Sequence, residues 1–175
     1  PTDILTFWFQ DTSPKQWWAV DPAFDDLLRQ RFGALLASAA HGELWSWRSS
    51  AGGRLAEVIV LDQFSRNIHR GTAAAFAQDA MALALAQEAV AAGALAALSS
   101  PIECAFLLLP YMHSESRVIH VEAERLYREH APADNHAFEL RHRAIVDRFG
   151  RYPHRNAVLG RVSTPEEREF LTQPG

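Results

Sequence analysis

The sequence predicts an all-α protein, and three observations support this fold class. Signals that begin or end helices recur along the chain, whereas the polar and apolar alternation of strands is almost absent. Alanine-rich stretches add strong helix propensity. A length of 175 residues, with 48% hydrophobic and 22% charged residues, is typical of one globular domain. We therefore expect residues 1–175 to form a single all-helical domain around one core.

The first half of the chain contains signals for three long helices. The first is expected to begin after Asp21, which is an N-cap followed by proline, and to end at Gly42. The second is expected over 53–69. The third should begin with Thr72 as its N-cap and run through a series of alanines to Gly93.

The second half predicts four further helices. Ser100 opens the sequence SPIE, which has the spacing of a capping box with proline at the first helical position. Pro110 should bend or end that helix. We expect two more helices over 115–130 and 134–149, and a short last helix after Thr164, which is again followed by proline and glutamate.

The links between these helices suggest their arrangement. Because the links are short, successive helices should be antiparallel neighbours, packed side by side as helical hairpins. The segment 150–163 differs, since it is long for a connection without its own helix, and such connections are often functional. It carries three arginines and one histidine. We therefore treat it as a candidate part of a site.

The tryptophans are confined to the start of the chain. All five fall within the first 47 residues, namely Trp8, Trp17, Trp18, Trp45 and Trp47. Their rings could form a stacking platform for a ligand. The interpretation that we favour is structural, with large buried rings fastening the N-terminal segment to the helices.

Composition argues against several classes of partner. The net charge of -4 makes nucleic acid a poor expected partner. The longest uncharged stretch, 89–102, is shorter than the roughly 20 residues that a membrane helix needs. The N-terminus lacks the features of a signal peptide. Cys104 is the one cysteine, which fits a reducing compartment, so we expect a cytoplasmic protein that does not associate with membranes.

The segment LDQFSRNIHRG, residues 61–71, places unusual polarity on an apolar helix. Asp62 continues an apolar stripe at helical spacing, and Arg66 follows it by four residues, so the two side chains could pair. An adjacent face carries Gln63, Asn67 and Arg70. A charge near a core needs a partner. We expect Asp62 and Arg66 to be buried and linked to the loop near residues 154–156.

Two other segments share this polarity, and together the motifs resemble a known family. PYMHSES contains His113 and Glu115, and FGRYPHRNAVLGR contains His154 and Arg155. With LDQFSRN, the N-terminal FWF and WW, and STPEE, they resemble the bacterial domain-of-unknown-function family 924 over essentially the whole chain.

The resemblance implies a fold, but no activity. The implied fold is all-helical and tetratricopeptide-like, a right-handed array of packed helical hairpins. Relatives often carry an Asp-Gln pair where this chain has Ile119 and His120. The distinctive polar positions of the family fall here on Asp62, Gln63, Arg66, Asn67, Arg70, His113, Glu115, His154, Arg155, Asn156 and Arg161.

Several kinds of chemistry are disfavoured by spacing. Asp62, His113, Glu115 and His154 could be considered as metal ligands, but their spacing is not that of a zinc site and nearby arginines would oppose a cation. Ser114 or Cys104 would need a nucleophile motif that the chain lacks. No glycine-rich phosphate loop is present. We therefore expect neither a metal nor a cofactor.

The leading hypothesis is a pocket for a small anion, carboxylate or phosphate. Guanidinium groups bind such anions with two hydrogen bonds at once. We expect the motifs of Asn67, His113 and Arg155 to meet at one partly open pocket. The ligand-binding candidates are Asp62, Gln63, Arg66, Asn67, Arg70, Arg155, Asn156 and Arg161.

The same pocket could also carry out a reaction such as hydrolysis. His113, His154 and Glu115 are the catalytic candidates, because histidine moves protons near neutral pH. If four arginines converge there with Asp62 and Glu115, two positive charges are left over to attract an anion. The alternative is that these groups only lock the loop onto the helices, in a protein- or peptide-interaction module.

Overall fold

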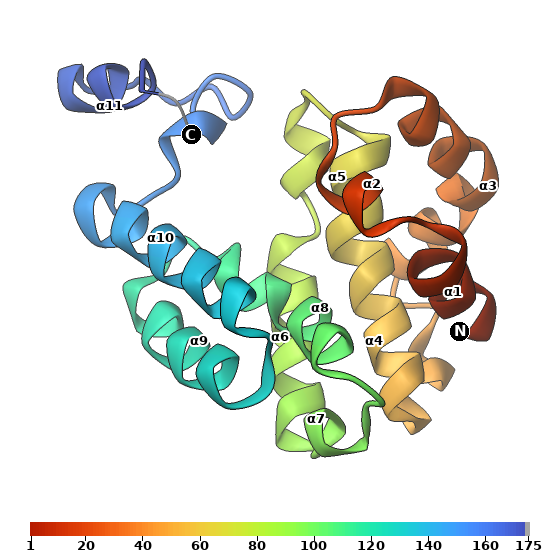
Figure 1. The fold of residues 1–175 in the computed structure, drawn as a ribbon. Coiled ribbons are helices and arrows are strands. Elements are labelled where there is room, and N and C mark those ends of the chain that lie inside the picture. Colours follow the sequence, from red (N-terminus) through yellow and green to blue (C-terminus); the bar gives the residue numbers. More distant parts are fainter. Residues whose placement is uncertain (174–175) are drawn as a thin grey trace.

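The computed structural model describes residues 1–173, which form helices and turns without a β-strand (Figure 1). The all-α class is thus confirmed. The α-helices of these residues are α1 (Thr2–Thr6), α2 (Pro14–Trp18), α3 (Pro22–Ala40), α4 (Ala51–Ile59), α5 (Ser65–Ile68), α6 (Asp79–Ala91), α7 (Ala94–Ala97), α8 (Pro101–Met112), α9 (Arg117–His130), α10 (Ala133–Phe149) and α11 (Pro165–Phe170).

The capping residues begin their helices as expected. The Asp21 carboxylate accepts hydrogen bonds from the backbone N–H groups of the second and third residues of α3, at 3.0 and 3.2 Å. Thr164 and Glu167 form a complete capping box at α11, in which each side chain accepts from the other residue's backbone N–H. Gly150 ends α10 with φ of +70°, a conformation that glycine adopts without strain.

Two helix ends differ from the prediction. Thr72 is not the N-cap of a long helix, because its hydroxyl donates to the His69 carbonyl and the alanines after it form a 3-10 turn, Ala73–Phe76. Helix α6 begins only at Asp79. Of the two outcomes expected at Pro110, a bend or an end, the end does not occur, since the hydrogen bond from His113 N to Leu109 O, 2.9 Å, carries α8 past it to Met112.

The N-terminal segment folds into helical turns that the sequence did not predict. A π-helical turn, Phe7–Asp11, joins α1 to residues before α2. Trp8 is fully buried, and Trp17 donates its indole N–H to the Trp8 carbonyl at 2.9 Å. These two rings act as the expected fastening. Trp18 is 58% exposed but stacks on Phe106 with ring centroids 5.8 Å apart, whereas Trp45 is 69% exposed and does not act in this way.

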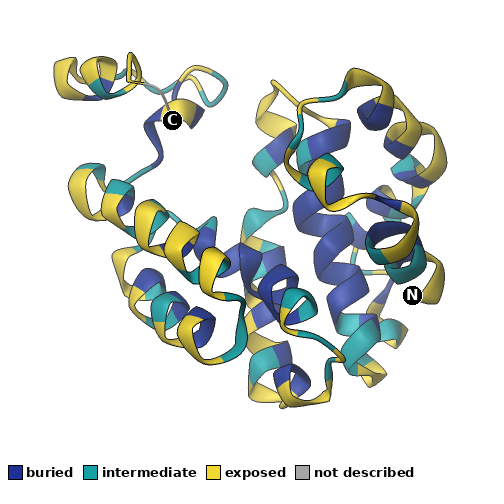
Figure 2. Ribbon diagram, viewed as in Figure 1, coloured by how far each residue is buried: buried dark blue, intermediate teal, exposed yellow. Residues whose placement is uncertain are grey.

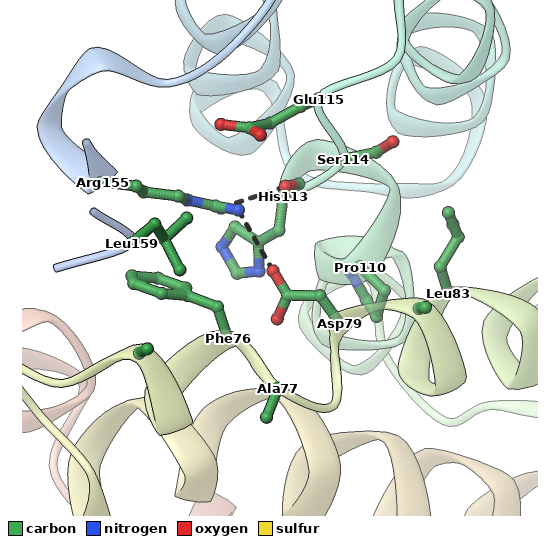
Figure 3. Close-up of a pocket in the computed structure, with 12 residues that line it drawn as sticks. Phe76, Ala77, Asp79, Leu83, Pro110, His113, Ser114, Glu115, Arg155 and Leu159 are labelled. Atoms are coloured by element: carbon green, nitrogen blue, oxygen red, sulfur yellow. Dashed lines mark hydrogen bonds and ion pairs between the residues drawn. The ribbon is translucent and has the colours of Figure 1, made fainter. Parts of the chain in front are cut away.

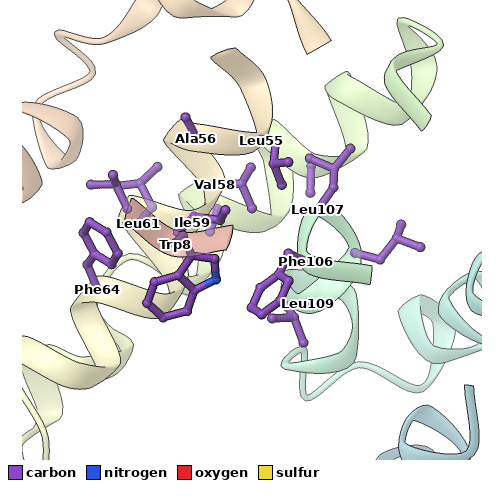
Figure 4. Close-up of a cluster of buried hydrophobic side chains, with 14 of the residues drawn as sticks. Trp8, Leu55, Ala56, Val58, Ile59, Leu61, Phe64, Phe106, Leu107 and Leu109 are labelled. Carbon is purple, nitrogen blue, oxygen red and sulfur yellow. The ribbon is translucent and has the colours of Figure 1, made fainter. Parts of the chain in front are cut away.

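The hydrophobic core is centred on α4 and α8 (Figure 4). Residues 55–64 are buried on every side, which is the pattern of a helix enclosed by others. Trp8 packs edge-to-face against Phe106 of α8, with ring centroids 5.7 Å apart. Each large side chain buried in this way contributes about 1.5–3 kcal/mol. The core therefore holds α1 to α9 together.

The C-terminal part contributes little to this core. The main cluster of buried apolar residues reaches only Tyr127 in α9. Figure 2 shows α10 largely exposed along one face, and Figure 1 shows the segment from 150 onward beyond the end of α10. This segment has no helix before α11 other than the 3-10 turn Pro153–Arg155. It is attached outside this core, by polar contacts and by the buried Tyr152.

Helices α8, α9 and α10 follow one another as helical hairpins. Short links, 113–116 and 131–132, join them, and α9 packs against both neighbours (Figure 1). This is the side-by-side packing that the short links predict. Within residues 1–173, no helix is both long enough and apolar enough to cross a membrane.

Candidate functional site

Asp62 lies within the longest run of buried residues in the described chain, 55–65. It lies in a π-helical turn, Val60–Phe64, between α4 and α5, and is 1% exposed. Such turns inside helices frequently occur at functional sites. Apolar neighbours on both sides predicted this burial. Leaving a carboxylate here without partners would cost several kcal/mol.

The partners of Asp62 come from its own helix and from α8. His113 Nδ1 lies 2.8 Å from Oδ1, Gln63 Nε2 donates to Oδ2 at 2.6 Å, and Arg66 Nη1 lies 3.0 Å from Oδ1. Burial alone would raise the pKa of Asp62, but Arg66 and the hydrogen bonds hold it well below its usual value. Asp62 is therefore ionised.

His113 is held at the end of α8, where the helix turns toward α9. Its side chain is 15% exposed. Burial and the nearby Arg66 guanidinium lower the pKa of His113 to about 4, despite the opposing effect of Asp62. The imidazole is thus neutral at pH 7, beside an ionised carboxylate.

Asp79, which the sequence did not single out, connects two of the expected arginines. Its Oδ2 accepts from Arg66 Nη2 at 3.0 Å and from Arg155 Nη1 at 3.1 Å. Arg155 also donates to the His113 carbonyl at 3.0 Å (Figure 3). This chain of contacts links Asp62 and Arg66 to the 150–163 segment, as expected.

The Arg155 guanidinium is further held between two aromatic rings. It lies 4.6 Å from the Phe76 centroid and 4.7 Å from the Tyr152 centroid. Arg155 is 6% exposed, and burial lowers its pKa. Its Nε has no hydrogen-bond partner within the described chain. A single buried cation therefore forms the centre of the contact between α6, α8 and the C-terminal segment.

Two neighbouring cavities meet at these groups. The larger, of about 460 Å³, is lined by Asp79, His113 and Arg155 with mostly apolar side chains (Figure 3). The smaller, of about 270 Å³, is lined by Arg66 and His154, among others. Both are bordered by Phe76, His113 and Arg155. We call the two cavities together the His113 cleft.

Other expected site residues form a separate network that fastens the loop. Arg161 binds Glu115 with two hydrogen bonds, of 2.6 and 3.0 Å, and Glu115 also accepts from Tyr152 N. The Asn156 amide accepts from Arg161 Nε and donates to the buried Glu167. Glu115 borders the larger cavity, but Arg161 and Asn156 do not line either one. The convergence of all the motifs on one pocket is therefore only partial.

Asn67 and Arg70 form a third group, with Asp25 of α3. Asn67 Nδ2 donates to Asp25 Oδ1 at 2.8 Å, and Arg70 binds both carboxylate oxygens at 2.6 and 2.9 Å. The Asn67 side chain itself lines neither cavity, because it points toward α3, although its motif reaches the cleft through Arg66. Arg70 still borders the smaller cavity. Asp25 was missed, although its position among the buried Phe24 and Leu28 of α3 was a signal.

Comparisons with known proteins identify the family. The family model described as "Bacterial protein of unknown function (DUF924)" matches residues 4–175. The chain belongs to this family. It is also similar to a solved structure described as "Structure of Protein of Unknown Function ATU0120 from Agrobacterium tumefaciens", with 39% identity, a TM-score of 0.91, and coverage of 97% of this chain and 95% of that one. No curated protein matches the chain.

This DUF924 member carries a second histidine and carboxylate pair at His120, one of the two positions where the sequence departs from the pattern of the resemblance. His120 Nδ1 lies 2.7 Å from Glu139 Oε1, and its Nε2 lies 2.8 Å from the Ser114 carbonyl and 3.2 Å from the Tyr152 hydroxyl. His120 and Glu139 are both 0% exposed. His120 thus has no access to a ligand, and Ile119 packs against the core.

The charges of the cleft balance, which corrects the expected excess of two positive charges. Asp79 compensates Arg155 and shares Arg66 with Asp62, whereas Asp25 compensates Arg70. The expected excess included only the acids Asp62 and Glu115 and omitted Asp79 and Asp25. In residues 1–173, no three His, Cys, Asp or Glu side chains gather in a way that could hold a metal ion.

Proposed function

We propose that the His113 cleft binds a small molecule that bears one anionic group, a carboxylate or a phosphate, beside Arg155. The observation that carries the proposal is the position of Asp79. Its carboxylate lies between Arg66 and Arg155 at the wall of the larger cavity. A carboxylate of the protein itself thus occupies the place where two guanidinium groups converge. A ligand would compete with Asp79 for them.

Size and charge favour a carboxylate ligand over a phosphate ligand. A cavity of about 460 Å³ falls in the range of small-molecule sites, about 300–1,000 Å³. Its largely apolar lining, with Phe76 and Leu83, suits a hydrocarbon or aromatic body. Since each arginine of the cleft already has an acidic partner, a doubly charged phosphate would be poorly neutralised. A benzoate-like molecule fits both conditions.

Calorimetric titration with benzoate, butyrate and inorganic phosphate tests this proposal. Arg155→Met should weaken benzoate binding at least about tenfold, because a charged hydrogen bond is worth about 1.5–3 kcal/mol. Asp79→Asn should strengthen it, since the internal competitor loses its charge. Arg148→Met, which removes an arginine that is 51% exposed and lines neither cavity, is the matched control. Equal binding by wild type, Asp79→Asn and Arg155→Met would overturn the proposal.

The second candidate is a tetratricopeptide-like interaction module, in which the polar groups serve only the fold. Consecutive hairpins of α8, α9 and α10 favour it, as do the exposed apolar side chains Val118, Val121 and Phe138 on α9 and α10. A protein partner that competes with benzoate is not expected, because these side chains are absent from the lining of the cleft. In either role we place the protein in the cytoplasm, where buried Cys104 stays reduced.

A further inference from the structure

The two ring nitrogens of His113 have different surroundings. Nδ1 faces Asp62 Oδ1 at 2.8 Å. Because Asp62 is ionised, its oxygens only accept hydrogen bonds, and the proton of the contact belongs to Nδ1. In a neutral imidazole the other nitrogen then has no proton. Nε2 is therefore a base with a free lone pair.

Nothing in the described chain occupies that lone pair. Nε2 makes no hydrogen bond to a residue of 1–173, and it does not belong to the buried polar atoms that lack a partner. It is thus accessible, on a ring that borders both cavities. The contrast with His120 is informative, because both nitrogens of that ring are bound inside the protein.

We infer that the His113 cleft is a hydrolytic site, in which His113 Nε2 is the general base that activates water against the acyl carbon of a small ester. Asp62 is the positioning residue that fixes the ring and its tautomer. The inference rests on the proposed function, because the ester must bind in the same cleft that accepts the carboxylate product. It adds a reaction to that function.

The proposed reaction consumes one water and returns His113 to its starting state. The water oxygen bonds to the acyl carbon while its proton moves to Nε2. The carbonyl oxygen becomes an oxyanion, and Arg155, which borders both cavities and donates to the His113 carbonyl at 3.0 Å, is the cation assigned to stabilise it. The bond to the leaving oxygen then breaks, and the imidazolium gives its proton to that oxygen. The products are a carboxylic acid and an alcohol.

Water is favoured as the nucleophile because the side-chain nucleophiles near His113 are engaged or distant. Ser114 Oγ accepts from Ser116 N at 3.2 Å. Cys104 is buried, and its thiol contacts the Leu95 carbonyl at 3.5 Å instead of the cleft. Acyl transfer is favoured over phosphoryl transfer because the balanced charges of the cleft would leave a dianionic phosphate ester without compensation.

Hydrolysis of p-nitrophenyl acetate and p-nitrophenyl butyrate tests the inference. His113→Gln keeps an N–H donor for Asp62 but removes the base, so the rate should fall about 10²- to 10⁴-fold. Asp62→Asn favours the wrong tautomer and should cause a loss of the same order with benzoate binding retained. His69→Gln, an exposed histidine outside the cleft, is the matched control and should keep the wild-type rate. Circular dichroism verifies that each variant is folded.

The pH profile and the binding measurement separate the outcomes. The wild-type rate should be constant from about pH 6 to pH 8 and fall toward pH 4, where His113 takes up a proton. Benzoate binding without ester hydrolysis, or hydrolysis that His113→Gln leaves unchanged, would overturn the inference and leave the proposed function standing. Absence of benzoate binding would overturn the proposed function itself.

Discussion

Two histidine and carboxylate pairs with short contacts, His113 with Asp62 and His120 with Glu139, differ in their surroundings. His113, which contacts the buried Asp62, lies at the wall of two cavities, and we call these two residues the open pair. Glu139 and His120 are both fully buried between α9 and α10, and we call them the sealed pair. The separation of nitrogen and oxygen is almost the same, 2.8 and 2.7 Å. The difference lies in the second nitrogen, which is open in His113 and bound in His120.

This difference separates a chemical role from a structural one. The sealed pair joins α9 and α10 to the 113–116 turn through the Ser114 carbonyl, and to the C-terminal segment through Tyr152. Both ring nitrogens of His120 form hydrogen bonds within the protein. In the open pair, Nδ1 of His113 contacts Asp62 and Nε2 stays available. Proximity of a histidine and an acid is therefore a weak signal of function until the second nitrogen is located.

The largest effect on stability is expected from removing Asp62, the carboxylate of the open pair. Asp62→Ala leaves Arg66 and Arg155 with only one shared carboxylate, Asp79, and leaves His113 without its acceptor. The free energy of unfolding should fall by roughly 3–5 kcal/mol, measured by urea denaturation. Asp147→Ala, at a side chain that is 49% exposed, should change it by no more than about 0.5 kcal/mol. Equal stability of the two variants would contradict the buried network.

Removing His120 of the sealed pair should lower the free energy of unfolding slightly less than removing Asp62. His120→Ala leaves a cavity and deprives Glu139 and the Ser114 carbonyl of their partners, at about 1–3 kcal/mol for each lost buried hydrogen bond. We expect a total of about 2–4 kcal/mol in the same urea experiment. Ester hydrolysis, measured well below the melting temperature, should be retained. If His120→Ala abolished hydrolysis while remaining folded, the two pairs would not have the separate roles assigned here.

The pH dependence of stability should reveal the lowered pKa of His113. The unfolded chain protonates this group near pH 6.5 and the folded chain only near pH 4, so stability is full above 6.5 and falls between these values. The difference corresponds to about 3 kcal/mol, at 1.36 kcal/mol for each pH unit. In His113→Gln, the free energy of unfolding should therefore decrease by about 3 kcal/mol less between pH 6.5 and pH 4 than in the wild type. Parallel curves for the two proteins would contradict the prediction.

The sealed pair should show a smaller effect of opposite sign. Burial raises the pKa of Glu139, so the unfolded chain ionises this carboxyl before the folded chain does. Its contribution to stability is therefore present below the ordinary pKa of glutamate and decreases as the pH rises through the raised value. Glu139→Gln should remove this decrease, as seen in melting temperatures between pH 4 and pH 7. If the melting temperature of Glu139→Gln fell more steeply with pH than that of the wild type, the pKa of Glu139 would not be raised.

Much of the fold follows from local signals in the sequence. Asp21, Ser100 and Thr164 cap their helices because a side-chain oxygen followed by proline satisfies the first free N–H groups in any context. Thr72 failed as a cap, because Phe76 and Asp79 belong to the cleft and the chain reaches them through a 3-10 turn. Tertiary contacts override propensity there.

The central residues of the site were predictable from the sequence, but the acids that pair with its arginines were not. The apolar stripe around Asp62 indicated burial, and the motifs with His113 and Arg155 were recognisable by their composition. Asp79 was not, because it stands alone among alanines in α6 and only the three-dimensional approach of Arg155 gives it a role. The charge balance of the cleft, which decides between carboxylate and phosphate, depends on such long-range pairs.

The most direct test of the central claim is the tautomer of His113, which nitrogen NMR of the ring reports. In protein labelled with ¹⁵N at histidine, with His113→Gln to assign the signals, we expect a proton on Nδ1 and none on Nε2 from about pH 5.5 to 8. The ring should titrate near pH 4. A proton on Nε2 at pH 7, or titration near the ordinary value of 6.5, would contradict the account, because His113 would then lack the free base that the cleft requires.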